Sequence, residues 1–291
     1  MTRSILVTGA TGSFGNSFVR RLLKTDGADR ICIFSRGEHT QAQMRQDLND
    51  DPRCRWFIGD VRDSQRLKRA MQGVDVVVHA AALKRIETAH FNPVELVRTN
   101  IDGSINVIEA AQDAGVKKVV ALSSDKACSP ISAYGSSKAL MESLFLAANN
   151  TVGANGPRFA VTRYGNVWNS AGSVVPTWRR MIESGAKAVP CTDPSATRFW
   201  MSLDQAVDLV LDTIDTMVGG ELAVPDLPAY RLSDLAEAMG VMTIVKGMPK
   251  HEKLHESMVD GEPSDLARRM SVEELKYQLE LIGYKAPARA A

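Results

Sequence analysis

Short runs of β-branched residues alternate with longer amphipathic segments through the first half of the chain, and this alternation restricts the fold more than any other feature. Strands and helices that follow one another in this way build a parallel sheet with helices on both faces. Right-handed crossovers place the loops after the strands at one edge of such a sheet, where ligands bind. We expect strands at residues 4–8, 30–35, 55–58, 74–80, 116–123 and 159–164, and helices at 14–24, 41–48, 64–71, 93–114 and 133–149.

After Tyr164 the alternation gives way to sequence interrupted by Gly and Pro, with helical patterns at 203–217 and 232–239. A chain of 291 residues is long enough for one large α/β domain with an appended lobe. We therefore predict a sheet domain from residues 1–166 and 200–218, and a smaller lobe from residues 167–199 and 219–284. The Ala- and Pro-rich tail, 285–291, is expected to be disordered.

Charge and cysteine content exclude several classes of function. The 35 basic and 34 acidic side chains leave a net charge of +1, which gives no global attraction to nucleic acid or an anionic membrane. Four cysteines lie far apart without a C-x-x-C pair, as expected of reduced thiols. The first strand begins directly after Met1-Thr2-Arg3 with no signal-peptide pattern, and the longest apolar stretches have only strand length. We expect a cytoplasmic protein that does not enter a membrane.

A T-G-x-x-G-x-x-G motif at residues 8–15 lies between the first predicted strand and the first predicted helix. Its glycines permit a tight turn and let backbone N–H groups at the helix N-terminus approach a pyrophosphate. A plain strand-to-helix turn is the alternative, but the flanking strand and helix favour dinucleotide binding. The residues expected to contact the dinucleotide here are Gly9, Thr11, Gly12, Ser13, Phe14 and Gly15.

The second predicted strand ends in Ser35-Arg36, where NAD-binding folds usually carry an acid for the adenosine ribose. A guanidinium at this point can bind a 2′-phosphate, so the sequence favours NADP over NAD. An ordinary surface arginine is the alternative. After the third strand, Asp60-Val61 is suitably placed to contact the adenine, although Asp60 could instead cap a helix.

Tyr134 and Lys138 form a Y-x-x-x-K pair on one face of a predicted helix, and Ser124 precedes them at a strand end. A nearby ammonium can lower the pKa of the phenol and make it a usable base. Together with the upstream glycine-rich loop, this ordered set resembles the short-chain dehydrogenase/reductase superfamily. The resemblance implies a Rossmann-like doubly wound sheet with a smaller C-terminal substrate-binding lobe.

Further motifs resemble one branch of that superfamily, the C5-inverting UDP-N-acetylglucosamine 4,6-dehydratases of polysaccharide biosynthesis. The most specific element is Asp125-Lys126. Dehydratases that retain the C5 configuration typically carry Asp-Glu at this point, and simple 4-epimerases carry neither pair. Both remain as alternatives. The other matching segments are residues 79–84, 92–93, 99–100, 122–127, 163–167, 172–176 and 197–200.

The resemblance implies the roles of the catalytic residues. Tyr134, with Lys138 and Ser124, would take the proton of the C4 hydroxyl while hydride passes to the nicotinamide. Lys126 would remove the C5 proton, provided that an apolar pocket and cationic neighbours lower its pKa. Asp125 would protonate the departing C6 hydroxyl. The hydride then returns to C6, so the enzyme would be a lyase that recycles its NADP.

The resemblance also implies the binding residues. Those expected near the cofactor are Ala80, Ala81, Ala82, Lys84, Asn100, Tyr164 and Asn166, in addition to the residues above. Those expected near a UDP-linked sugar are Lys84, Asn166, Ser173, Val174, Arg198 and Lys250, with Arg198 on the diphosphate. Helices 93–114 and 133–149 pair subunits in this superfamily, so a homo-oligomer is expected.

One segment departs from the family pattern. Relatives commonly read Arg-Pro-Gly-Glu-Lys-Leu-His-Glu, with the arginine on the diphosphate, where this chain reads Pro-Lys-His-Glu-Lys-Leu-His-Glu at residues 249–256. Either Lys250 or Lys253 substitutes for the arginine, or the nucleotide-sugar differs. The departure creates His251-Glu252-x-x-His255, a zinc-hydrolase pattern that would require a deep helix. That pattern in a peripheral lobe is a remote alternative, so no metal site is predicted. A non-catalytic dinucleotide sensor is a third possibility.

Overall fold

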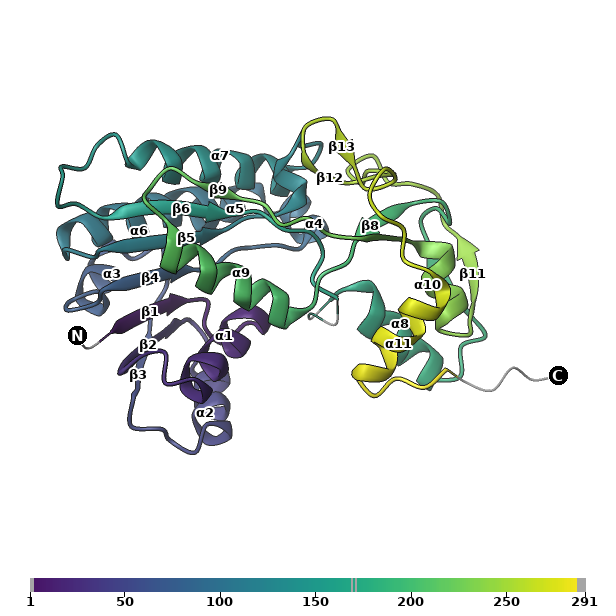
Figure 1. Ribbon diagram of the computed structural model, residues 1–291, viewed down its shortest axis with the longest axis horizontal. Coiled ribbons are helices and arrows are strands. Elements are labelled where there is room, and N and C mark those ends of the chain that lie inside the picture. Colours follow the sequence, from purple (N-terminus) through teal and green to yellow (C-terminus); the bar gives the residue numbers. More distant parts are fainter. Residues whose placement is uncertain (1–2, 169, 171, 287–291) are drawn as a thin grey trace.

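The computed structural model describes residues 3–168, 170 and 172–286, and its centre is a seven-stranded sheet (Figure 1). Every pairing within this sheet is parallel, which confirms the predicted fold class. The order is β3-β2-β1-β4-β5-β6-β9, so the chain reverses direction across the sheet between β1 and β4. The strands are β1 (Ser4–Thr8), β2 (Arg30–Ser35), β3 (Cys54–Ile58), β4 (Val76–His79), β5 (Lys118–Leu122), β6 (Arg158–Thr162) and β9 (Leu222–Ala223).

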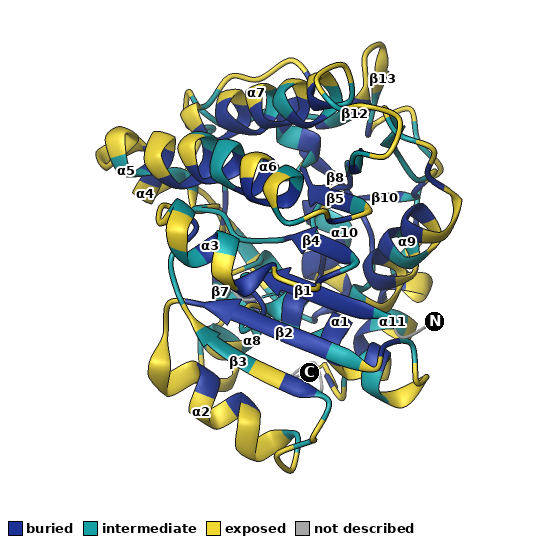
Figure 2. Ribbon diagram, turned by 90° about the vertical axis from the view of Figure 1, so that its left-hand side faces the viewer, coloured by how far each residue is buried: buried dark blue, intermediate teal, exposed yellow. Residues whose placement is uncertain are grey.

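Helices cover both faces of the sheet because the strands are apolar on both faces. Successive side chains of a strand point to opposite faces, so Ile5 and Val7 pack in one core and Leu6 in the other. The first core includes residues of α1 (Ser13–Lys24), α2 (Glu38–Asp47) and α9 (Leu203–Thr216). The second includes residues of α3 (Ser64–Ala70), α6 (Gly103–Asp113) and α7 (Ala133–Ala148). Figure 2 shows the buried central strands between these layers, and the largely exposed outer side of α2.

The helix predicted over 93–114 is interrupted by a π-helical turn. Helix α4 (Ile86–Phe91) is followed by α5 (Pro93–Val97), the π turn η1 (Arg98–Asp102) and α6. The turn buries the side chain of Asn100, whose amide bonds the backbone of Leu83 at both atoms and Ser137 Oγ at 3.0 Å. Tertiary hydrogen bonds therefore favour a wider turn that the sequence pattern did not predict.

A third hydrophobic core lies in the second part of the chain, to the right in Figure 1. Helices α8 (Val174–Glu183) and α11 (Val272–Leu281) were not predicted. Pro176 interrupts the apolar pattern of α8, but proline is tolerated in the first turn of a helix. The remaining elements are β7 (Ala188–Cys191), β8 (Thr197–Phe199), β10 (Ala229–Arg231), α10 (Leu232–Ala238), β11 (Met242–Val245), β12 (Ser257–Val259) and β13 (Glu262–Pro263).

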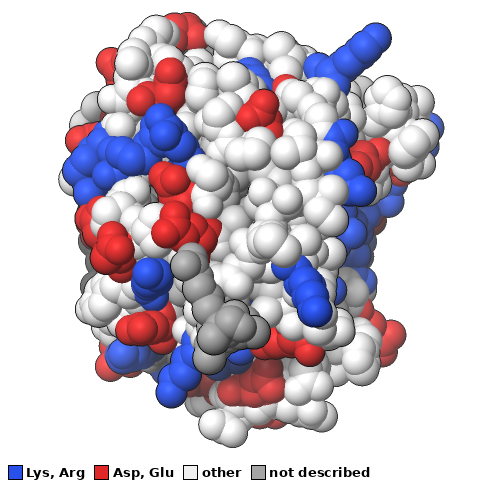
Figure 3. Space-filling view, turned by 90° about the vertical axis from the view of Figure 1, so that its right-hand side faces the viewer, with Lys and Arg blue, Asp and Glu red and all other residues white. Residues whose placement is uncertain are grey.

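The predicted two-part domain division stays a prediction, and residues 287–291 of the predicted tail lie outside the described residues. Within the described part of the chain, no helix is both long and apolar enough to span a bilayer. On the face shown in Figure 3, acidic and basic side chains are mixed around a largely uncharged centre.

Close backbone approach makes Gly15 a sensitive position. A Cβ at Gly15 would lie 2.5 Å from Ala10 Cα, whereas a Cβ at the exposed Gly153 would meet nothing within 4 Å. We expect Gly15→Ala to lower the free energy of unfolding by about 1–3 kcal/mol through overpacking. Gly153→Ala should leave it nearly unchanged. Urea denaturation of both variants tests this, and equal midpoints would contradict it.

Candidate active site

A cavity of about 790 Å³ lies at the carboxyl edge of the sheet, between the strand-end loops and the second part of the chain. It brings together most residues that the sequence singled out. The predicted binding residues that line it are Gly9, Thr11, Gly12, Ser13, Phe14, Gly15, Ser35, Arg36, Asp60, Val61, Ala80, Ala81, Ala82, Lys84, Tyr164, Asn166, Ser173, Val174 and Arg198. The predicted catalytic residues that line it are Ser124, Lys126, Tyr134 and Lys138. Asn100, Asp125 and Lys250 are not among its lining residues.

The glycine-rich loop is packed too closely for side chains. Gly9 has a φ of +66°, and a Cβ there would lie 2.8 Å from the backbone nitrogen of Ala81. Gly12 is the N-cap of helix α1 and supplies no side-chain acceptor to its first turn. These features leave a concave backbone surface at a helix N-terminus, and this geometry fits the pyrophosphate of a dinucleotide.

At the end of the cavity near β2, Arg36 is 57% exposed at its side chain, and its Nη1 lies 3.8 Å from Asp60 Oδ2. Burial alone would raise the pKa of Asp60, but Arg62, at 2.7 Å, and Arg36 lower it below its usual value. Ser35 Oγ accepts a hydrogen bond from Gln41 Nε2 at 3.0 Å. Arg36 therefore lines the cavity, and its contact to Asp60 is a long one to a carboxylate that is also paired with Arg62.

The predicted catalytic residues lie at the N-termini of two helices, the short 3-10 helix η2 (Asp125–Ala127) and α7. Ser124 caps η2, and Ser132 caps α7, which carries Tyr134 and Lys138. Burial raises the pKa of Tyr134 to about 12, although Lys126 and Ser124 lower it in part. Burial lowers the pKa of Lys138 to about 8.

Lys126 is a cation that lowers the pKa of the Tyr134 phenol, and the role expected for Lys138 stays a prediction. Lys138 Nζ donates a hydrogen bond to the carbonyl oxygen of Leu122 at 2.6 Å. The helical spacing does place Lys138 on the face that carries Tyr134, but the strand-end carbonyl binds the ammonium. The sequence pattern cannot show that contact, because it depends on the packing of α7 against β5.

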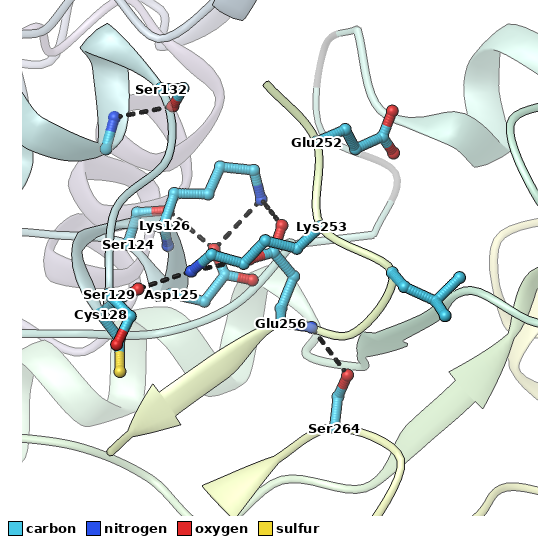
Figure 4. Close-up of polar contacts among 12 residues, drawn as sticks. Ser124, Asp125, Lys126, Cys128, Ser129, Ser132, Glu252, Lys253, Glu256 and Ser264 are labelled. Atoms are coloured by element: carbon cyan, nitrogen blue, oxygen red, sulfur yellow. Dashed lines mark hydrogen bonds and ion pairs between the residues drawn. The ribbon is translucent and has the colours of Figure 1, made fainter. Parts of the chain in front are cut away.

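Lys126 lies beside two acidic side chains in addition to the cationic neighbours that we expected (Figure 4). Its Nζ lies 3.2 Å from Asp125 Oδ1 and 3.1 Å from Glu256 Oε1. Burial alone would lower the pKa of Lys126, but these two carboxylates outweigh it and raise the pKa above its usual value. The expectation of a lowered pKa was therefore wrong for this arrangement of the chain.

Asp125 lies behind the cavity wall. Its carboxyl is fully buried, and its Oδ1 accepts a hydrogen bond from Ser124 Oγ at 2.9 Å. Among the described residues, no group donates a hydrogen bond to its Oδ2. A proton can therefore pass between Asp125 and the cavity only through its neighbours, of which Ser124 and Lys126 both line the cavity.

Comparison with known proteins identifies the family. The model of the polysaccharide biosynthesis protein family matches residues 5–275. The chain belongs to that family. It is 47% identical over 266 residues to the UDP-N-acetylglucosamine 4,6-dehydratase (inverting) of Campylobacter jejuni subsp. jejuni serotype O:2, which covers 91% of this chain and 79% of that protein.

Two further relatives extend the comparison. The UDP-glucose 4-epimerase of Rickettsia akari is 42% identical, over 91% of this chain and 80% of that protein. Among solved structures, Pen from Bacillus thuringiensis superimposes with a TM-score of 0.90 at 31% identity, and the match covers 97% of this chain and 98% of that chain. The resemblance inferred from the motifs is thereby confirmed, and both dehydratases and epimerases are among the relatives.

The segment that departs from the family pattern has an unexpected role. Lys250 is exposed and is not among the residues that line the cavity, so its predicted substrate contact stays a prediction. Lys253 Nζ donates to the carbonyl oxygen of Cys128 at 2.5 Å and does not line the cavity. Glu252 does line the cavity, and it forms an ion pair with Arg198 at 2.5 Å. The diphosphate arginine predicted from the sequence is thus held by a carboxylate from this same segment.

The zinc pattern does not fold as a zinc site would require. The segment that contains His251 and His255 is not helical, so the two imidazoles do not share a helix face. His255 Nδ1 is hydrogen-bonded to Thr197 Oγ1 at 2.8 Å, and Glu252 is occupied by Arg198. In the described part of the chain, no group of three or more His, Cys, Asp or Glu side chains is arranged to hold a metal ion.

Two buried residues, Asn100 and Glu256, do not line the cavity. The sequence predicted a role for the first and none for the second. Asn100, expected to contact the cofactor, is buried with its amide engaged by Leu83 and Ser137. Glu256 is buried against Lys126 and was assigned no role, although it ends the quoted segment 249–256. Its place as an acid in that family motif could have drawn attention to Glu256. The sequence does not show, however, that its partner is Lys126.

A buried histidine links the two central loops. His79 Nδ1 lies 2.8 Å from Thr8 Oγ1, and its Nε2 lies 3.3 Å from Ser104 Oγ. Thr8 Oγ1 in turn accepts a hydrogen bond from the backbone N–H of Ala81. Burial, together with the positive charge of Lys138, lowers the pKa of His79 to about 3.

This histidine predicts a stability loss in mild acid. The unfolded chain protonates the imidazole below about pH 6.5, whereas the folded chain does not until about pH 3, so stability falls as the pH drops through that window. His79→Gln should be less stable near neutral pH by about 1–3 kcal/mol, because buried hydroxyls lose a partner. Its stability should decrease less steeply in acid. Urea unfolding at several pH values measures both, with the exposed His39→Gln as control, and parallel pH curves for wild type and His79→Gln would contradict the assignment.

Proposed function

We propose that the protein is an NADP-dependent, C5-inverting UDP-N-acetylglucosamine 4,6-dehydratase, a hydro-lyase. The observation that carries this proposal is the placement of Lys126 and Ser124 beside Tyr134 on one cavity wall, in a chain 47% identical to an inverting dehydratase. The product would be a UDP-linked 6-deoxy-4-keto sugar. A UDP-glucose 4-epimerase is the second candidate, because relatives of similar identity carry that name.

The cofactor end of the cavity fits a nicotinamide dinucleotide. The residues that would hold its pyrophosphate are those of the loop from Gly9 to Gly15, where a Cβ at either glycine would collide with backbone. Arg36 would bind the 2′-phosphate that distinguishes NADP from NAD. When bound, the nicotinamide supplies the capacity to accept a hydride and to return it.

Tyr134 acts on the C4 hydroxyl of the sugar. Its phenol is buried at the cavity wall and has a pKa raised to about 12, so it holds its proton in the resting protein. The Lys126 charge favours the phenolate and thereby makes proton uptake from the C4 hydroxyl feasible. The cavity wall formed by Ser124 and Tyr134 positions that hydroxyl.

Lys126 and Asp125 divide the elimination chemistry. Lys126 lines the cavity and is the base for the C5 proton, whereas the fully buried Asp125 is the acid for the C6 hydroxyl. The 3.2 Å contact between them lets Lys126 give one proton to Asp125, so that the amine becomes free and the carboxyl becomes protonated. The proton reaches the C6 oxygen through Ser124, whose hydroxyl joins Asp125 to the cavity.

The nucleotide diphosphate is bound by Arg198. This guanidinium is buried and lines the cavity, and Glu252 is its acidic partner at 2.5 Å. Asn166, Ser173 and Val174 line the same cavity and contribute neutral contacts. A UDP-linked sugar agrees with the substrate named for the Campylobacter relative.

Assembly and location complete the proposal. Phe91 is 80% exposed on α4, and Val94 and Val97 on α5 are also exposed. This apolar surface lies beside the helices expected to pair, and it supports a homo-oligomer. All four cysteines are free and buried, which supports a cytoplasmic location.

The decisive variant is Lys126→Ala. In deuterated water, wild type should incorporate deuterium at C5 and yield a C5-inverted 6-deoxy-4-keto product from UDP-N-acetylglucosamine. The variant should oxidise C4 more slowly, because Tyr134 and Lys138 remain but the Lys126 charge that favours the phenolate is lost, and it should show neither C5 exchange nor loss of water. NMR of the product and the absorbance of the reduced dinucleotide follow the two steps. A C5-retained product, or a simple C4 epimer from wild type, would refute the inverting assignment.

Cofactor preference tests Arg36. We expect wild type to bind NADP more tightly than NAD, and Arg36→Asp to weaken NADP binding by about 1.5–3 kcal/mol, roughly 10- to 100-fold in Kd. NAD binding should be unchanged or improved. Calorimetric titration measures each Kd, and Arg45→Gln, on the exposed side of α2, is the matched control. Equal affinity of wild type for the two dinucleotides would contradict this role.

A further inference from the structure

The ammonium of Lys126 has an acceptor for each of its three protons. Its Nζ lies 3.2 Å from Asp125 Oδ1, 3.1 Å from Glu256 Oε1 and 3.3 Å from Asn166 Oδ1. A lysine ammonium has three donors and no acceptor, so this environment is saturated only while Lys126 is charged. Of the three partners, Asn166 is neutral and Asp125 belongs to the catalytic pair. Glu256 is the acid without an assigned role.

Glu256 is held rigidly in this position. Its backbone N–H donates to Ser264 Oγ at 3.0 Å, and its carbonyl oxygen accepts from the Ser264 N–H at 2.7 Å. Ser264 is fully buried and also contacts Thr197 Oγ1, at 2.6 Å. The carboxyl therefore projects from a fixed backbone onto Lys126, as Figure 4 shows.

The two oxygens of this carboxylate differ. Oε1 is paired with Lys126, whereas Oε2 is buried with no hydrogen-bond partner among the described residues. The nearest other cation is Lys253, whose Nζ lies 3.9 Å from Oε2 and also donates to the carbonyl oxygen of Cys128. Lys126 is therefore the principal group that compensates the buried charge of Glu256.

We propose that Glu256 is a positioning residue that holds the Lys126 amine toward the substrate and sets its strength as the C5 base. This inference rests on the proposed function, since it concerns the same proton transfer. Lys126 lines the cavity and Glu256 does not, so Glu256 acts through the lysine and does not touch the sugar.

A second carboxylate, Glu256, helps Lys126 to take up the C5 proton. Lys126 first gives a proton to Asp125, and the freed amine lone pair then takes the C5 proton. The C5–H electron pair moves into the enolate of the 4-keto sugar, and the C6 hydroxyl leaves as water with the proton from Asp125. Lys126 ends as an ammonium beside an ionised Asp125. The fixed charge of Glu256 stabilises that ammonium as it forms, so the amine is a stronger base than it would be with Asp125 alone.

Several other charged or titratable groups act on Lys126 from the surrounding elements. Asp125 lies on η2, Arg198 on β8, Lys253 beside Glu256, Tyr134 on α7 and Tyr230 on β10. Arg198 opposes the effect of the two carboxylates. Removal of the Glu256 charge alone leaves all of these groups in place, which makes Glu256→Gln a selective test.

The first measurement does not depend on turnover. Acetic anhydride labelling of the holoprotein as a function of pH, followed by peptide mass spectrometry, reports the fraction of neutral Lys126 amine. In Glu256→Gln, the rise in Lys126 labelling should move to lower pH by about 1–3 units, as expected for loss of an adjacent opposite charge. The exposed Glu262→Gln, on β13, should label as wild type does, and Glu256→Asp should restore part of the shift. An unmoved rise in Glu256→Gln would overturn the inference, whatever reaction the protein catalyses.

The second measurement is the pH dependence of C5 deuterium exchange. In Glu256→Gln the rising limb should move to lower pH, and the plateau rate should fall because the amine is a weaker base. A lower plateau with an unmoved limb would show a merely structural role and contradict the inference. If wild type binds UDP-sugars but exchanges no C5 proton, the proposed function fails while the labelling result still decides the role of Glu256.

Discussion

Direct contact between two backbone loops controls the geometry of the whole site. The loop after β1 packs on the loop after β4 so closely that a Cβ at Gly9 would lie 2.8 Å from the Ala81 nitrogen. Thr8 Oγ1 joins the same loops by accepting from Ala81 N–H and contacting His79. Because these strands lie where the sheet order reverses, the contact defines the floor of the cavity. The contact therefore joins the cofactor loop directly to the loop after β4.

The second part of the chain completes the catalytic cluster rather than only covering it. Arg163, directly after β6, donates to both oxygens of Glu142 on α7 and to the carbonyl oxygen of Met258 on β12. Lys253 binds the carbonyl oxygen of Cys128, directly after η2. These contacts bring the segment that carries Glu252 and Glu256 against Arg198 and Lys126. The charges of Lys126 and Arg198 are therefore balanced by Glu256 and Glu252, two acids far away in the sequence.

Local patterns predicted the fold and the strand-end motifs because the forces that form them are local. Alternating periodicity identified the six longer strands of the sheet, and the glycine spacing identified the first loop. The missed features depend on tertiary contacts. No spacing rule joins Lys126 to Glu256, turns Lys138 toward the carbonyl of Leu122, or places Lys250 outside the cavity. Resemblance supplied Arg198 and Asn166 as candidates, but only packing shows which charges surround them.

The π turn at Arg98–Asp102 changes the angular phase of the helical path from Pro93 to Asp113. An α-helix advances by about 100° per residue, so the one-residue-wider turn rotates every side chain of α6 relative to α5 by roughly that angle. Helix α5 can therefore present Val94 and Val97 outward while α6 turns Val107 and Ala111 into the sheet core. Helices α5 and α6 therefore continue one another without a loop, although α5 turns apolar side chains to the surface and α6 turns them into the core. The single additional residue of the π turn makes this change of face possible.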